Sequence, residues 1–240
     1  MHIHTEQNLL IYFGDASTAV DASDISRYQC KNLIEHASFC DLKKQMPNMH
    51  NLFFAHQVHG VDGFHVHNAD VAEIVSFSVS ADYLVTHDTG IAIGVLTADC
   101  LPIIMYDPQH NAVAVVHAGW RGAVAGITQK AIAHMQKEFG SKNTDLKIFF
   151  GPCAGVCCYE ISNEFLQNVT EFHEQSIVNK NNRLFFNLTQ YMFERLMAYG
   201  IPAKNICNDY HACTICNHAF CSYRRGAGSA LRQMTVALIK

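Results

Sequence analysis

Three short stretches of the chain carry side chains that can bind a metal ion. They are AHQVHG with His59, LTADCLP with Cys100, and VVHAGWRG with His117. Zinc accepts sulfur and nitrogen ligands, and a catalytic zinc site has three protein ligands and one position left for water or substrate. The three residues could therefore form a catalytic zinc site if the stretches meet in space. His56, in the first stretch, ranks below His59 because it lies further from the turn at Gly60.

The same side chains also suit a cysteine hydrolase. In that alternative Cys100 is the nucleophile and His117 is the base that activates it. A purely structural role is the third alternative, because a buried cysteine usually fills the core and a histidine at a strand end usually lies at the surface. The metal content of the protein separates the two functional hypotheses, because a bound zinc ion occupies the thiolate.

Apolar runs beside these stretches are typical of buried strands, whose ends would position the reactive groups. We predict strands in residues 52–60, 101–108 and 112–117, the first of which runs into a turn. The runs ADYLVT and GIAIGVLT predict two more strands around the turn HDTG, and LKIFFGP predicts another.

Three further segments have helical spacing. Residues 24–43 predict a helix, and so do the apolar residues between 124 and 139, after which Gly140 supplies a stop. The run NLTQYMFERLMAYG predicts a helix that is capped by Asn187 and ended by Gly200. Strands outnumber helices and do not alternate regularly with them, so the sequence predicts the α+β class.

Composition narrows the class of protein. The 240 residues are 49% apolar and 16% charged, with a net charge of -4, which is typical of a globular protein, and we expect one domain over residues 1–240. The basic residues are scattered and form no basic stripe, so we expect no nucleic-acid partner. With no signal peptide and no apolar stretch long enough for a membrane span, we expect a cytoplasmic protein without a membrane partner. The ten cysteines are then expected to stay reduced.

Five ordered motifs resemble the YfiH family, also called the laccase-domain or multicopper polyphenol oxidoreductase family. The motifs are QVHG, LTADCLPIIMYDP, VHAGWRG, GPCAGVCCYEI and CSYRR, which lie within residues 52–232. The resemblance implies an α+β domain with a mixed β-sandwich core flanked by helices. It also implies that His59, Cys100 and His117 are the metal ligands and catalytic residues of a zinc site, with copper as the less favoured metal.

Members of the family that resemble this chain are described as purine nucleoside phosphorylases. The resemblance implies a zinc-dependent enzyme that converts adenosine, inosine, guanosine or methylthioadenosine, together with phosphate, into base and ribose 1-phosphate. It also implies adenosine deaminase activity, which suits zinc because the bound metal lowers the pKa of its water to about 7. A purine nucleoside and phosphate are therefore the expected partners, and the oligomeric state stays open.

Arginines near two of the motifs are candidates for binding phosphate, because the planar guanidinium matches two phosphate oxygens. Arg121 is expected just before a helix, where free N–H groups would add to anion binding. Arg224 and Arg225 are the second candidates, with a solvated surface pair as their alternative. Trp120 and Tyr223 could stack on a purine, although a single aromatic side chain is more often part of the core.

Two further stretches are rich in cysteine. GPCAGVCCYEI contains Cys153, Cys157 and Cys158, which we expect to pack inside a tight turn. CNDYHACTICNHAFC contains Cys213 and Cys216 at the spacing of a zinc ligand pair, but a structural zinc site needs two such pairs separated by a loop. The sequence therefore predicts no second metal.

The family names leave two more alternatives open. One is a copper-dependent polyphenol oxidoreductase, but the pairs HIH and HVH lie in exposed-looking segments, and three ligands cannot build several copper centres. The other is a non-enzymatic cell-envelope quality-control or interaction protein, which rests only on the family's further label, peptidoglycan editing factor. The chain also departs from the family, because its N-terminal stretch IYFGDASTAV lacks the usual arginine. If that arginine contacts substrate in other members, we expect weak or altered activity here.

Overall fold

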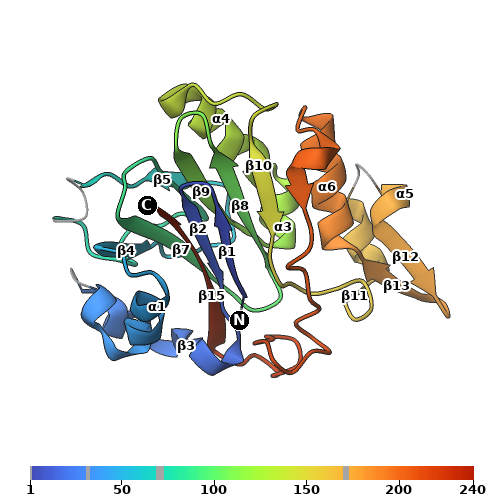
Figure 1. The fold of residues 1–240 in the computed structure, drawn as a ribbon. Coiled ribbons are helices and arrows are strands. Elements are labelled where there is room, and N and C mark those ends of the chain that lie inside the picture. Colours follow the sequence, from blue (N-terminus) through green and yellow to red (C-terminus); the bar gives the residue numbers. More distant parts are fainter. Residues whose placement is uncertain (1, 31–32, 69–72, 170–172) are drawn as a thin grey trace.

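Two β-sheets pack face to face, and helices cover their outer faces (Figure 1). The computed structural model describes the chain except residues 1, 31–32, 69–72 and 170–172. In the described part of the chain, none of the helices has the length and apolar character needed to cross a membrane.

Both large sheets are mixed, with parallel pairs β4–β7, β5–β6 and β10–β14 among antiparallel ones. The first sheet has the order β1 (His2–Glu6), β2 (Leu9–Phe13), β15 (Leu231–Ile239), β7 (Ile91–Thr97) and β4 (Asn51–Phe54), with β3 (Val20–Asp21) paired to β15. The second has the order β14 (Ile206–Cys207), β10 (Lys147–Phe150), β8 (Leu101–Asp107), β9 (Ala112–Ala118), β6 (Tyr83–Thr86) and β5 (Gly63–His65). A small third sheet contains β11 (Glu160–Ile161), β13 (Arg183–Phe186) and β12 (Ile177–Lys180).

Helices cover the two sheets from opposite sides (Figure 1). The second sheet is covered by α3 (Trp120–Val124), α4 (Ile127–Phe139) and α6 (Leu188–Ala198), and α5 (His173–Ser176) packs against α6. The first sheet is covered by α1 (Cys40–Gln45) and the 3-10 turns η2 (Ala22–Tyr28), η3 (Leu33–Glu35) and η4 (Ala37–Phe39). The remaining 3-10 turns are η1 (Ala16–Thr18), η5 (Asn163–Asn168) and η6 (Ala203–Asn205).

Alternating side chains along the strands build these layers. On β8, Ile103 and Met105 pack toward the helices, while Ile104 and Tyr106 pack between the two sheets. Such alternation follows from the pleat of a strand, which points successive side chains to opposite faces. The predicted α+β class with a mixed β-sandwich core flanked by helices is therefore confirmed. The single domain over residues 1–240 stays a prediction. The pairing of β15, near the C-terminus, with β2, near the N-terminus, agrees with it.

Most expected elements are present. The strands predicted in residues 52–60, 101–108 and 112–117 correspond to β4, β8 and β9. The N–H of Gln190 donates to Oδ1 of Asn187 at 3.2 Å, so α6 is capped at the predicted residue. The strands around HDTG, β6 and β7, do not pair with each other but lie in different sheets. The helix expected up to Gly140 is divided at Gly126, whose φ is 88°.

The prediction of one helix over residues 24–43 is wrong. Within the described part of this segment only α1 is an α-helix, and 3-10 turns precede it. Asp24 has φ -138° and ψ 84°, and its carboxylate accepts a 3.2 Å hydrogen bond from the N–H of Ser26. Short polar side chains compete in this way with the hydrogen bonds of a regular helix. The apolar spacing of this segment was therefore not sufficient to form one continuous α-helix.

Candidate active site

His59, Cys100 and His117 meet at one edge of the sandwich. Their possible ligand atoms all lie within 4.8 Å of one another, and the two imidazole rings are 4.8 Å apart between centroids. Pro102 pairs with His117 in the β8–β9 hairpin, so Cys100, directly before β8, lies beside the end of β9. The convergence on which the metal-site prediction depends is therefore present, although the three residues come from separate parts of the chain.

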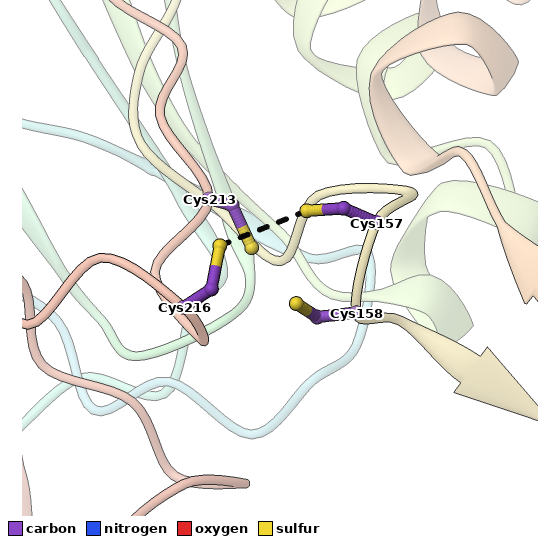
Figure 2. Close-up of side chains that lie close together, drawn as sticks. All are labelled: Cys157, Cys158, Cys213 and Cys216. Carbon is purple, nitrogen blue, oxygen red and sulfur yellow. Dashed lines mark hydrogen bonds between the residues drawn. The ribbon is translucent and has the colours of Figure 1, made fainter.

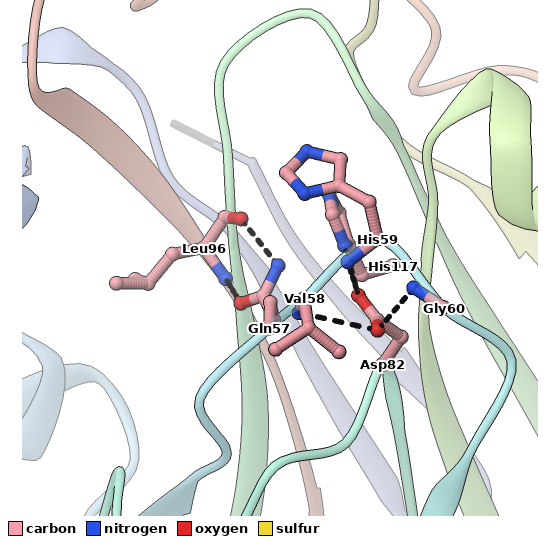
Figure 3. A network of polar contacts seen from close by, with 7 residues as sticks. All are labelled: Gln57, Val58, His59, Gly60, Asp82, Leu96 and His117. Atoms are coloured by element: carbon pink, nitrogen blue, oxygen red, sulfur yellow. Dashed lines mark hydrogen bonds and ion pairs between the residues drawn. The ribbon is translucent and has the colours of Figure 1, made fainter.

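The carboxylate of Asp82 connects the two histidines (Figure 3). Its Oδ1 accepts hydrogen bonds from Nδ1 of His117 at 2.8 Å and from the backbone N–H of His59 at 2.9 Å. Its Oδ2 accepts from the N–H groups of Gly60 at 2.6 Å and Val58 at 3.2 Å. Because an ionised carboxylate only accepts, the proton of this bond lies on Nδ1 of His117. Nε2 of His117 is then the nitrogen available to a metal ion.

The loop that carries His59 is attached to β7 by one side chain (Figure 3). The amide of Gln57 donates to the carbonyl oxygen of Leu96 at 2.8 Å and accepts from its N–H at 2.8 Å. His59 itself has a left-handed φ of 61°, a conformation that costs energy and is held by its surroundings. A Cβ on Gly119 would lie 3.1 Å from Sγ of Cys100 and 3.2 Å from Cδ2 of His59. Glycine therefore leaves the space that both side chains need.

Cys100 and His117 favour each other's charged forms. Burial raises the pKa of Cys100, but the charge of His117 and hydrogen bonds from both histidines outweigh burial and lower the pKa to about 6. Burial lowers the pKa of His117, but the Cys100 thiolate and the Asp82 carboxylate outweigh it and raise the pKa to about 9. At neutral pH the metal-free site therefore holds a thiolate next to an imidazolium.

A cavity of about 540 Å³ opens beside these residues. His59, Cys100 and His117 line it together with Arg121 and Arg224. Its other lining residues include three aromatic side chains and one more arginine: Trp120, Tyr159, Tyr223 and Arg232. A cavity of this size with a few convergent polar groups is typical of a site for a small molecule.

The predicted phosphate-binding residues divide into two groups. Arg121 and Arg224 line the cavity, whereas Arg225 does not. The guanidinium of Arg225 donates to backbone carbonyl oxygens of the 214–220 segment, including those of Thr214 at 2.5 Å and Phe220 at 2.5 Å. Arg225 therefore supports the loop. The expected helix after Arg121 already begins at Trp120, so Arg121 lies inside the short helix α3 and not before it.

The predicted stacking residues both lie at the cavity. Trp120 packs partly against the core, and its ring centroid lies 5.0 Å from that of Phe165. The guanidinium carbon of Arg121 lies 4.6 Å from the centroid of the Trp120 ring. Tyr223 is 52% exposed and so is the freer of the two rings.

Several residues of the site were not recognised in the sequence. They are Asp82, Gln57, Tyr159 and Arg232. Asp82 left one signal, because it is an acidic residue directly before the apolar run YLVT. Arg232 lies on β15, where it pairs with Val20, so the cavity has a third arginine near the N-terminal segment that lacks one.

The donor set fits a divalent metal ion. Two imidazoles and one thiolate are ligands that zinc and copper both accept. A histidine whose second nitrogen donates to a carboxylate, as Nδ1 of His117 does to Asp82, is typical of metal-bound histidines. The cluster of His59, Cys100 and His117 can therefore hold a metal ion.

The fold and the site define the class of this protein as a layered α+β sandwich with a cavity whose two histidines and one cysteine could hold a metal ion. The model of the family described as multi-copper polyphenol oxidoreductase laccase matches residues 32–240. The chain therefore belongs to this family, and the resemblance to the YfiH family is confirmed. The crystal structure of the Bacillus licheniformis hypothetical protein YfiH has a TM-score of 0.79 to this structure, at 23% identity, and the match covers 97% of this chain and 93% of that one.

Two relatives in sequence have names that state an activity. A purine nucleoside phosphorylase of Clostridium acetobutylicum is 31% identical over 168 residues, which cover 68% of each chain. An adenosine deaminase of an unknown prokaryotic organism is 35% identical over 162 residues, which cover 65% of this chain but 61% of that protein. Both names describe enzymes that act on purine nucleosides.

Proposed function

We propose that this protein is a zinc-dependent purine nucleoside phosphorylase that also deaminates adenosine. The observation that carries the proposal is the meeting of His59, Cys100 and His117 in a cavity that Arg121 and Arg224 also line. The names of the two relatives support the same pair of activities. The proposed substrates are adenosine, inosine, guanosine and methylthioadenosine, each with phosphate for the phosphorylase reaction.

The side chains of the cavity have separate tasks in this proposal. Zinc bound by His59, Cys100 and His117 would supply a water molecule of lowered pKa. Arg121 and Arg224 bind the phosphate oxygens through charge-assisted hydrogen bonds. The exposed ring of Tyr223 offers a face on which a purine can stack.

Two reactions then use one nucleoside site. In phosphorolysis a phosphate oxygen bonds to C1′ of the ribose, the bond from C1′ to the purine breaks, and the purine leaves with the electron pair and takes up a proton. In deamination water adds to the purine carbon that carries the amino group, and ammonia leaves. Only the first reaction requires phosphate, so the arginines serve phosphorolysis specifically.

The test uses purified protein whose metal content has been measured. Adenosine with phosphate is expected to yield adenine and ribose 1-phosphate, and adenosine alone is expected to yield inosine. If neither adenine nor inosine forms with the zinc-loaded protein, the proposed function is wrong.

A cysteine hydrolase is the second candidate, because Cys100 and His117 form the thiolate and imidazolium pair that such an enzyme uses. Alkylation by iodoacetamide separates the candidates. In a zinc enzyme the metal protects Cys100 until a chelator removes it, whereas in a cysteine hydrolase Cys100 reacts at once in the protein as purified.

The copper-dependent oxidoreductase is supported by the family's description alone. The histidines of the HIH and HVH pairs belong to neither of the two potential ligand groups that the described residues form.

The cytoplasmic location also stays a prediction.

A further inference from the structure

Four cysteine side chains from two loops that are distant in sequence converge near the surface, and they form a group separate from the three candidate ligands of the active site. Sγ atoms of Cys157, Cys158, Cys213 and Cys216 all lie within 4.8 Å of one another (Figure 2). Cys157 and Cys216 are exposed and the other two are partly buried. The prediction that Cys153, Cys157 and Cys158 pack inside a turn therefore holds only for Cys153, which is fully buried.

The spacing of the sulfur atoms fits a tetrahedral metal site. Zn–S bonds of about 2.3 Å place the sulfurs of a tetrahedron about 3.8 Å apart. Sγ of Cys157 and Sγ of Cys216 lie 3.8 Å apart, and all ten cysteines of the chain are free thiols. A disulfide requires sulfurs about 2.05 Å apart. The two loops thus supply the two ligand pairs, separated in sequence, that a structural zinc site needs.

The backbone around the cluster is arranged for sulfur ligands. The N–H of Gly155 donates to Sγ of Cys213 at 3.3 Å, and such a donor favours the thiolate form that binds metal. A Cβ on Gly155 would lie 3.3 Å from Sγ of Cys157 and 2.9 Å from Cβ of Cys213. Any side chain at Gly155 would therefore push the two loops and their sulfurs apart.

Backbone hydrogen bonds fix the two loops beside the cluster. The N–H of Cys153 donates to the carbonyl oxygen of Ala212 at 3.1 Å, and the N–H of Thr214 donates to that of Cys153 at 2.9 Å. The cysteine pairs are thus brought together by pairing that does not itself depend on a metal.

We propose that Cys157, Cys158, Cys213 and Cys216 bind one zinc ion as four thiolates, as a structural site separate from the active site. The four thiols release their protons as the metal binds. All four ligand positions are taken by protein, so this ion has no open position for water or substrate.

The same two loops contact Asp99, which lines the active-site cavity. Thr214, next to Cys213, donates from Oγ1 to Oδ1 of Asp99 at 2.7 Å, and the N–H of Ala154 donates to the carbonyl oxygen of Asp99 at 2.9 Å. Asp99 directly precedes Cys100. Zinc in the cysteine cluster would thus stabilise the loops that hold Asp99, and its main effect would be on stability.

The experiment counts zinc by elemental analysis in protein purified with reductant, saturated with zinc and freed of excess metal. The wild type is expected to hold about two zinc ions per chain. Cys100→Ala is expected to keep about one, which belongs to the cysteine cluster, and Cys157→Ser/Cys216→Ser is expected to keep the other. Cys40→Ser, which changes an exposed cysteine outside both sites, is the matched control and should keep both.

A second measurement serves if the double variant does not fold. Cys100→Ala protein is loaded with Co²⁺, whose charge-transfer absorption reports bound thiolates, and its free thiols are titrated before and after a chelator is added. Cobalt–thiolate absorption and the release of about four protected thiols are expected. Cys100→Ala protein that stays free of zinc after saturation with zinc would overturn the proposal. Neither readout uses turnover, so the result is independent of the proposed enzyme activity.

Discussion

Nδ1 of His117 donates to Oδ1 of Asp82 at 2.8 Å, and the same oxygen accepts the backbone N–H of His59 at 2.9 Å. One buried carboxylate therefore orients the ring of one candidate metal ligand directly and holds the backbone of a second candidate. The left-handed φ of His59 is explained by this contact, because the N–H groups of Val58 and Gly60 also point to Asp82. The geometry of the site thus depends on Asp82, which is not among the residues that line the cavity.

Asp82→Asn should weaken zinc binding by about 10- to 100-fold, because the amide replaces an oxygen that accepts two backbone N–H groups. It should also lower the free energy of unfolding by about 1–3 kcal/mol, because donors are left unpaired. Zinc titration and denaturant unfolding measure the two effects. Asp107→Asn is the matched control. Asp107 is also buried, and its Oδ2 accepts a 2.8 Å hydrogen bond from Nδ1 of His110, outside the candidate site. Equal zinc affinities of the two variants would contradict the orienting role of Asp82.

Cys100→Ala should abolish zinc binding at the active site together with phosphorolysis and deamination. Both reactions are expected to fall by at least about 100-fold, because the variant loses the metal that both share. Elemental analysis and product assays follow the change, with Cys40→Ser as the control. Turnover that survives in the variant would show that the metal ligands are assigned wrongly.

Arg121→Met should impair phosphorolysis far more than deamination. Loss of a charge-assisted hydrogen bond to phosphate costs about 1.5–3 kcal/mol, so kcat/KM for phosphate should fall by about 10-fold or more. The formation of inosine from adenosine without phosphate should change little. Arg183→Met is a suitable control, because Arg183 pairs with Glu160 at the surface. Equal losses in both reactions would argue against a phosphate role for Arg121.

The stability of the metal-free protein should depend on pH through Cys100 and His117. The pKa of Cys100 is lowered from 9.0 to about 6, so its contribution is complete above pH 9.0 and is lost as pH falls through about 6. The pKa of His117 is raised from 6.5 to about 9, so its contribution is complete below pH 6.5 and is lost as pH rises through about 9. The two shifts describe one ion pair, which therefore stabilises the fold between about pH 6 and pH 9.

The measurement compares the Tm of metal-free wild type and metal-free Cys100→Ser across pH. Their difference should be largest inside that window and shrink on both sides, with each kcal/mol worth about 2–4 °C in a chain of this size. A difference that stays constant with pH would show that the pair does not form.

The sequence predicted those parts of the fold and the site that one continuous stretch determines. Apolar runs such as 101–108 form strands, and the cap at Asn187 depends on its own neighbours. The three candidate metal ligands were predicted because each lies within a distinctive short motif, and the structure brings them together.

Features that depend on which strands and loops pair were not predicted. The importance of Asp82 follows from the pairing of β6 with β9, which places it opposite His117. The cysteine cluster joins Cys157 and Cys216, which are 59 residues apart, so neither stretch contained a complete ligand set. Arg225, adjacent in sequence to a cavity residue, is directed to the 214–220 loop, which the spacing of the motif did not reveal.

The most direct test of the account is an anomalous-scattering map of a crystal of the native protein, recorded at the zinc absorption edge. We expect a peak bonded to Sγ of Cys100 at about 2.3 Å and to nitrogens of His59 and His117 at about 2.0–2.1 Å. A map in which no ion lies between these three side chains, although the protein was supplied with zinc, would contradict it.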